Sequence, residues 1–279
     1  ERFRAGSRVQ EEVKQLRRGI RITYADENPG FHIDVTPARA INGNSQSNGE
    51  GKLEVPDREA GWKASSPIPY SKWLQVASTQ TISLEEHIAV ATIQRHRDEW
   101  AIRTNNTDHR PISAVITTLA THAYLDVAKG SQSTPIRPLD AILEIIRRMP
   151  DHVQYLGTEC QVCNPADSGE NFAEKWNRPL DGLRYRRAFQ EWHENASASV
   201  SLGLESFESA EAFAKAVNES FGIGPTFVSA VNSEIPPNWT MPGRPDGTTR
   251  NTTLMGTMFG GVSGTSSSQE DVKPVGRLG

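Results

Sequence analysis

Apolar and polar residues alternate in two runs near the start of the chain, at residues 20–24 and 31–35. A period of two places successive side chains on opposite faces of a strand. Between the runs, residues 26–30 read Asp-Glu-Asn-Pro-Gly, which is typical of a turn. These segments predict a β-hairpin, or at least two neighbouring strands. Pro37 ends the second strand, and residues 42–51, rich in Asn, Gly, Ser and Gln, predict a surface loop.

Residues 8–18, before this hairpin, have the features of a short helix. Ser7 and Gln10 have the spacing of a capping box. Gly19 stands where a helix end favours a residue in the left-handed region. We therefore expect a helix over residues 8–18.

The helical period dominates from about residue 60 onward. A second capping box, at Ser83, predicts a helix that runs to about Ile102. Pro111 is expected in the first turn of the next helix. The apolar residues of that helix recur at helical spacing and predict a buried stripe: Ile112, Val115, Ile116, Leu119, Ala120, Ala123 and Val127.

Three further helices follow in the second half of the chain. Pro138 opens the first, which ends at Pro150 and turns five residues inward: Leu139, Ile142, Leu143, Ile146 and Met149. Residues 170–195 and 208–220 also have a helical pattern, and Gly222 closes the last one.

The pattern weakens after residue 232, where Pro, Gly, Thr and Ser dominate and no aromatic residue follows Phe259. Such a composition predicts a flexible tail over 232–279. The fold class is therefore α+β, with a strand-bearing part at 1–60, a helical domain at 61–231 and the tail.

The composition excludes several classes of protein. The chain has 279 residues and a mass of 30.8 kDa, which allows one large domain or two small ones. No apolar stretch approaches the length of about 18 residues that a membrane span needs. The formal charge of −4 argues against a protein that binds bulk duplex DNA. Two cysteines cannot form a disulfide framework, so we expect a cytoplasmic protein.

Asp34 is an unusual residue for a strand, because Asp is depleted there. Two interpretations are open. It belongs to a solvated sheet face together with His32 and Thr36, or it is a metal ligand held on a rigid sheet. One carboxylate is too few for a two-metal site, so the second interpretation requires partners elsewhere.

Three other motifs also have two interpretations. Cys160 and Cys163 form a CxxC without a second pair, which favours burial over a zinc or redox site, and we expect no zinc. The polar run at residues 94–98 is either a solvated helix face or a phosphate contact, as is the arginine cluster at 184–187. Ser113 lies two residues after Pro111, at the expected start of a helix, where it is either a helix cap or a phosphate ligand.

Several segments together resemble one family, the bacterial CD-NTases, which are cGAS-like nucleotidyltransferases of anti-phage defence. The resemblance covers about residues 10–225. Its motifs are Gly30–Arg39, Val55–Arg58 followed by Gly61-Trp62 and Ser66-Pro67 to Trp73, Arg95–Asp98, Arg110–Tyr124, Asn164-Pro165 and Glu170–Trp176. The segment from Arg95 to Tyr124 is the most specific of these.

The resemblance implies a polymerase-β-like nucleotidyltransferase core joined to a C-terminal α-helical domain. Such enzymes join NTPs into a cyclic di- or trinucleotide second messenger without a template. Two Mg²⁺ ions, held by three carboxylates, activate the attacking hydroxyl and neutralise the leaving pyrophosphate. Asp34 matches the third carboxylate, and Ser113 matches a hydroxyl that contacts the nucleotide.

The chain departs from the family pattern at two places. The Gly-Ser motif and the Asp-x-Asp pair normally lie several tens of residues before the position of Asp34, and both are missing here. Because the chain also starts at Glu1 rather than Met, we interpret it as N-terminally truncated and expect it to be inactive by itself. The family usually has Lys before Arg-His-Arg-Asp, where this chain has Gln94. Arg95 then becomes the candidate phosphate ligand beside it.

Three interpretations of function therefore remain: a cyclic oligonucleotide synthase, a linear oligonucleotide synthase, and a non-catalytic module that binds a nucleotide or a protein. NTPs are the expected substrates of the enzyme. The chain ends in a polar tail with a terminal glycine, Gly279, which suits the narrow channel of a ubiquitin-like activating enzyme. Some systems that resemble this one encode E1/E2-like partners, so Gly279 is a candidate conjugation site or simply the end of an idle tail.

Overall fold

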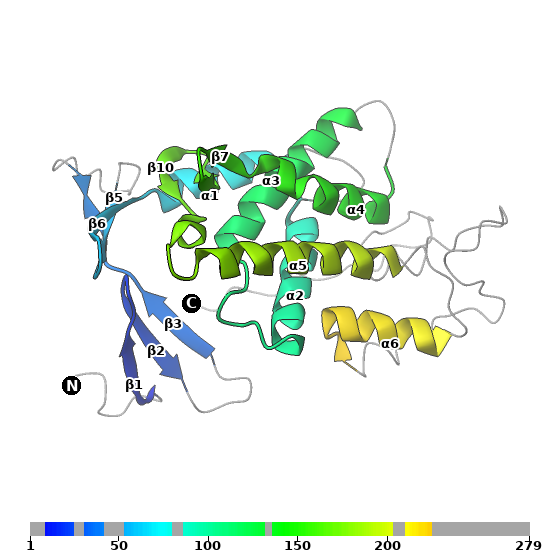
Figure 1. Cartoon of the computed structure of the whole chain (residues 1–279), viewed down its shortest axis with the longest axis horizontal. Helices are drawn as coiled ribbons and strands as arrows, with labels where there is room; N and C mark the ends of the chain where they lie inside the picture. Colours follow the sequence, from blue (N-terminus) through cyan, green and yellow to red (C-terminus); the bar gives the residue numbers. More distant parts are fainter. Residues whose placement is uncertain are drawn as a thin grey trace, which may run out of the picture.

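The computed structural model is a mixed α+β fold, with small antiparallel sheets at one end and a helical body at the other (Figure 1). The predicted turn at 26–30, the loop at 42–51, Ser83 and the tail with Gly279 lie outside the residues that the structure describes. The structure describes residues 9–24, 31–41, 53–79, 86–131, 136–202 and 210–224.

The first sheet contains the predicted hairpin. Strands β1 (Val9–Gln15), β2 (Ile20–Tyr24) and β3 (Phe31–Val35) are antiparallel in the order β1-β2-β3. Ile22 lies opposite Val13 on one side and Ile33 on the other, so the apolar residues of all three strands share one face. The alternation therefore predicted both strands of the hairpin correctly.

The predicted helix at 8–18 is wrong, because this segment forms strand β1. A helix of about eleven residues is marginal without packing, whereas pairing with β2 satisfies the backbone groups along the strand. Gly19 has a different task from the expected helix cap. A Cβ atom there would lie 2.3 Å from the carbonyl oxygen of Val35, so the close approach to β3 requires glycine.

A second sheet follows, and only its last strand lies where the sequence pattern indicated helix. Strands β4 (Arg39–Ala40), β5 (Leu53–Asp57) and β6 (Gly61–Ser65) are antiparallel in the order β4-β5-β6. Two small strand pairs lie later in the chain, between the helices: β7 (Gln154–Leu156) with β8 (Glu159–Gln161), and β9 (Cys163–Asn164) with β10 (Asp167–Asn171).

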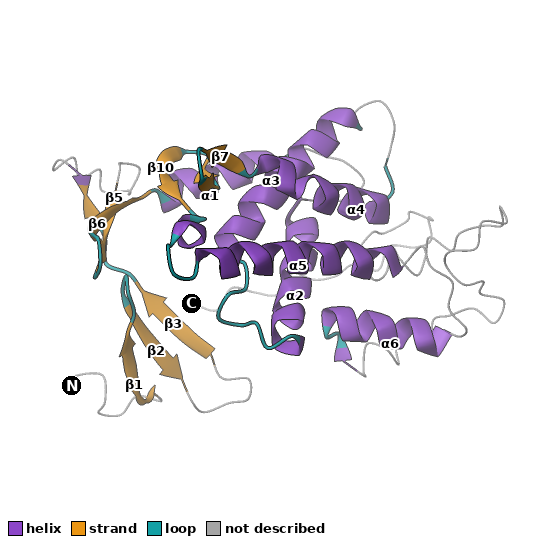
Figure 2. Ribbon diagram, viewed as in Figure 1, coloured by secondary structure: helices purple, strands orange, loops and turns teal. Residues whose placement is uncertain are grey.

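The helical body is coloured purple in Figure 2. Its α-helices are α1 (Pro67–Ala77), α2 (Glu86–Arg103), α3 (Ser113–Gly130), α4 (Pro138–Arg148), α5 (Gly182–Ser201) and α6 (Ala210–Phe221). Two 3₁₀ turns, η2 (Met149–His152) and η3 (Glu174–Asn177), join them. Helix α5 begins later than the predicted residue 170, because β10 and η3 occupy the first part of that segment. No described helix is long and apolar enough to cross a bilayer.

Helix α3 forms the centre of the core, as its apolar stripe predicted. Six of the seven stripe residues are buried, and Ile112 at the end is 38% exposed. The predicted face of α4 packs on the same core, with Ile142, Ile146 and Met149 fully buried. Gly222 has φ of +58°, so it closes α6 in the left-handed region as expected.

Charged side chains join the sheets to the helical body. Asp57, whose side chain is fully buried, accepts hydrogen bonds from the Nε atoms of Arg17 and Arg18, each at 2.9 Å. Burial by itself would raise the pKa of Asp57, but these two donors lower it well below its usual range. Glu174 of η3 contacts both Arg18 and Lys63. The first and second sheets are thereby tied to each other and to η3.

Candidate functional site

Asp34 lies on the polar face of the first sheet, directly opposite Arg21 of β2. The Arg21 Nε and Nη2 atoms donate to the two carboxylate oxygens at 2.7 and 2.8 Å. These hydrogen bonds lower the pKa of Asp34, which keeps it ionised at neutral pH. The carboxylate remains 41% exposed, so it faces solvent as an ion pair and not as a lone charge.

The described residues do not fit a two-ion magnesium site. Both oxygens of Asp34 are engaged by a guanidinium, which an ion would have to displace. Within the described ranges, no group of three or more His, Cys, Asp or Glu side chains is arranged to hold a metal ion. Asp34 is thus a single candidate ligand among the described residues.

The beginning of helix α3 brings together two of the three predicted nucleotide-binding residues. Gln94 of α2 donates from Nε2 to the hydroxyl oxygen of Thr117 at 2.7 Å. Ser113 lies one helical turn before Thr117 and is exposed, as the first residue of α3. Gln94 and Ser113 therefore both lie where α2 meets the N-terminal turn of α3.

Arg97 of α2 lies on the buried side of this junction. Its side chain is 5% exposed, and its Nη1 atom donates to the Ser113 Oγ at 3.0 Å and to the carbonyl oxygen of Pro111 at 3.2 Å. Because Ser113 accepts from Arg97, its own hydroxyl proton remains available for an acceptor outside. The Nε and Nη2 atoms of Arg97 pair with the Asp98 carboxylate at 3.0 and 2.7 Å, so its charge is already balanced, and the N-terminus of α3 is the feature of the junction that favours an anion.

Arg97 was not selected from the sequence, because the run at 94–98 did not reveal which of its residues are buried. His96 and Arg97 are 1% and 4% exposed, so two of the five residues of that polar run lie in the interior. A useful signal was available: Arg97 lies four residues after Ile93, on the side of α2 that the apolar residues mark as inward.

Arg95, the third predicted nucleotide ligand, points to a different place. Its guanidinium donates to the carbonyl oxygens of Phe221 at 2.8 Å and Gly222 at 2.7 Å, at the C-terminal end of α6. It also pairs with Glu99 at 2.8 Å. A cation at a helix C-terminus stabilises the carbonyl groups there. Arg95 therefore holds α6 against α2 and does not join Gln94 and Ser113.

The other two motifs contribute to packing. Cys160 is buried on β8 and Cys163 is partly buried on β9, both as free thiols, and burial raises the pKa of each. Arg186 of α5 donates to the carbonyl oxygens of Trp176 and Thr158 at 2.9 and 3.1 Å. Arg186, one member of the arginine cluster at 184–187, therefore holds α5 against these two segments.

Comparison with protein-family models finds no match for this chain, and neither does comparison with curated proteins. Solved structures do match. The Bradyrhizobium diazoefficiens CD-NTase CdnG in complex with GTP superposes with a TM-score of 0.52 and is 18% identical. The match covers 82% of this chain and 70% of that one.

Two structures of the Vibrio cholerae enzyme DncV are similar as well. A DncV di-nucleotide cyclase mutant in a complex that contains ATP and GTP has a TM-score of 0.55, with 16% identity over 78% of this chain and 55% of that one. The cyclic AMP-GMP synthase in complex with a linear intermediate has a TM-score of 0.54, with 15% identity over 78% and 54%. The chain thus spans about half the length of these Vibrio proteins.

These likenesses show the fold. The chain has a CD-NTase-like fold, in which part of a polymerase-β-like nucleotidyltransferase core precedes a helical domain. The fold expected from the sequence motifs is confirmed.

Proposed function

We propose that this chain belongs to a nucleotidyltransferase that joins NTPs into a cyclic di- or trinucleotide second messenger in anti-phage defence. The observation that carries the proposal is the fold, which extends over about four fifths of the chain and is shared with CdnG and DncV. Those proteins are described in complexes with GTP, with ATP and GTP, and with a linear intermediate, which supports nucleotides as the substrate class.

The α2–α3 junction supports the proposal from the chain's own residues. Ser113 is exposed at the start of an 18-residue helix, and the Arg97 guanidinium lies 3.0 Å behind its hydroxyl oxygen. In this proposal, Ser113 donates a hydrogen bond to a phosphate oxygen, Arg97 orients the Ser113 hydroxyl, and the α3 backbone N–H groups stabilise the negative charge. Gln94 is held by Thr117 and supplies a neutral contact where a lysine would supply a charge.

The test is product analysis. The complete gene product is incubated with all four NTPs and Mg²⁺, and the products are identified by mass spectrometry. A cyclic oligonucleotide supports the proposal. A linear oligonucleotide that retains its 5′-triphosphate assigns the alternative linear synthase. Ser113→Ala should weaken NTP binding, whereas the control Ser131→Ala, at the other end of α3, should bind like the wild type.

One observation favours a second function, a non-catalytic module that binds a nucleotide or a protein. Arg21 engages both carboxylate oxygens of Asp34, and Gln94 replaces the usual lysine, so neither position offers a free charge for catalysis of this kind. Binding of NTPs without any product from the complete protein would assign this function. Conjugation of Gly279 by E1/E2-like partners stays a prediction, because this residue lies beyond the described part of the chain.

A further inference from the structure

The solvent-exposed side of helix α5 forms a stripe of charged residues. This helix lies across the front of the helical body in Figure 1. One side of it is buried in the core and includes Tyr185, Phe189 and Trp192. The opposite side, which we call the α5 stripe, is exposed and follows the helical period: Leu183, Arg184, Arg187, Glu191, Glu194 and Ala198.

The charges of the α5 stripe are separated along the helix. Arg184 and Arg187 lie in its N-terminal half, and Glu191 and Glu194 follow further along. Among the residues that the structure describes, these four side chains form no ion pair or hydrogen bond. Arg184 also lies in the first turn of α5, where the helix dipole favours an acidic residue instead. The stability of the helix itself therefore does not explain this order of charges.

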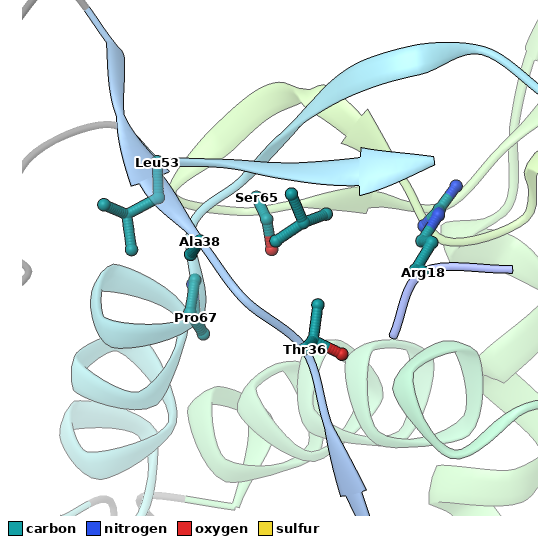
Figure 3. Close-up of a pocket in the computed structure, with 7 residues that line it drawn as sticks. Arg18, Thr36, Ala38, Leu53, Ser65 and Pro67 are labelled. Carbon is teal, nitrogen blue, oxygen red and sulfur yellow. The ribbon is translucent and has the colours of Figure 1, made fainter. Parts of the chain in front are cut away.

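Other charged side chains are compensated within the chain. On α4, Arg147 pairs with Glu144 at 2.7 Å. In the pocket of about 320 Å³ that Figure 3 shows, Arg18 is a lining residue, and its guanidinium contacts Asp57 and Glu174. The α5 stripe differs from these sites because its charges are left to water or to a second molecule.

The order of the charges along α5 is complementary to itself. Phe189 lies midway between Arg187 and Glu191, and also midway between Arg184 and Glu194. A second α5 that runs antiparallel, with a two-fold axis level with Phe189, therefore brings each arginine opposite a glutamate of the other copy. Packed helices lie about 8–10 Å apart, a gap that long charged side chains can span. A parallel arrangement would bring like charges together, so the charges favour the antiparallel one.

Two exposed leucines extend this surface at the start of the helix. Leu180 is 98% exposed and Leu183 is 77% exposed, so both offer apolar area to a partner. In the antiparallel arrangement, Leu180 lies near Ala198 of the second copy, whose small side chain leaves room for it. The helix pair thus has apolar contacts toward its two ends and ion pairs between them.

We propose that this chain forms a homodimer in which the α5 stripes of two copies pack antiparallel about a two-fold axis. Arg184 pairs with Glu194 of the second copy and Arg187 with its Glu191, and symmetry repeats both pairs. One helix face is small beside the standard interface of about 800 Å² per partner, so the dimer is weak and forms at high protein concentration. This self-association does not depend on the proposed nucleotidyltransferase activity.

Sedimentation velocity of the purified chain tests the proposal. Between about 1 and 300 μM, we expect the wild-type chain to shift from monomer to dimer. Raising the NaCl concentration from about 0.05 M to about 0.5 M should shift it back toward monomer, because salt screens the ion pairs.

Charge reversal identifies the surface that mediates the dimer. Arg187→Glu should weaken dimerisation by at least about tenfold, because it brings like charges together across the axis, and Glu191→Arg should do the same. The double variant, Arg187→Glu with Glu191→Arg, restores opposite charges across the axis and should dimerise again. The matched control is Lys129→Glu on α3, which changes the net charge as Arg187→Glu does and should dimerise like the wild type.

These substitutions replace exposed side chains, so the melting temperatures should stay at the wild-type value. A wild-type chain that stays monomeric at every concentration would overturn the proposal. So would a dimer that Arg187→Glu leaves unchanged, or a double variant that dimerises no better than the two single variants.

Discussion

The Asp34–Arg21 pair is exposed on the polar face of the first sheet. A substitution of Asp34 can therefore affect function without affecting stability. An exposed ion pair contributes little to folding because water and salt screen it. Asp34→Asn should therefore leave the melting temperature of the protein within error of the wild type. If the proposed function holds, the same substitution lowers product formation by the complete protein by orders of magnitude.

The matched control is Asp140→Asn, which breaks another exposed Asp–Arg pair, on α4. It should change neither stability nor turnover. Wild-type turnover in Asp34→Asn would show that Asp34 is only a surface residue of the strand.

His96 is the single residue from which we expect the clearest pH dependence. Burial, and then the charge of Arg103, lower the pKa of His96 from 6.5 to about 4. Between these values the unfolded chain binds more protons than the folded one, so the free energy of unfolding falls as the pH decreases. At about 1.4 kcal/mol per pKa unit, we expect the protein to lose about 2 kcal/mol between pH 7 and pH 5 through this group.

Urea denaturation at the two pH values measures this loss. His96→Gln should flatten the dependence, whereas His109→Gln, at a less buried histidine, should retain it. An unchanged slope in His96→Gln would assign the acid sensitivity to other groups.

At the scale of elements, helix α3 is the part whose packing decides the stability of the helical body. Leu119 is fully buried in the middle of its apolar stripe. Leu119→Ala removes buried methyl groups and leaves a cavity, so it should lower the free energy of unfolding by about 2–5 kcal/mol.

Ile112→Ala is the matched control on the same stripe. Because Ile112 is 38% exposed at the end of the helix, its truncation should cost clearly less in urea denaturation. Equal losses for the two variants would mean that the stripe is not the core of the body.

At the scale of the whole molecule, residues 1–279 contain one of the three carboxylates that the CD-NTase pattern implies. We predict that the purified chain 1–279 forms no cyclic or linear product from NTPs and Mg²⁺, because most of the expected stabilisation of the transition-state charge is missing. NTP binding at the α2–α3 junction should persist, which mass spectrometry and calorimetry measure separately. Detectable product from this chain would contradict the prediction.

Local pattern by itself determined the β2–β3 hairpin and the helices α3, α4 and α6. Their side-chain periods are set within the element, and each buries the face that its own period marks. Asp34 and Ser113 could be selected as candidates from the sequence, because a carboxylate in a strand and a hydroxyl at a helix start are both visible locally, and the structure places them in β3 and at the start of α3.

Tertiary structure alone decided the features that depend on partners far away in the chain. Residues 9–15 became strand β1 because β2 offers backbone partners that outweigh a local capping signal. Arg95 attaches α6 to α2, because its hydrogen-bond acceptors lie 126 and 127 residues later, at the end of α6. The pocket of about 320 Å³ that Arg18 lines needs the β1–β2 turn, the segment after β3, the second sheet and the start of α1 together. Side-chain period within an element is a local property, whereas hydrogen-bond partners and cavities depend on the packing of distant segments.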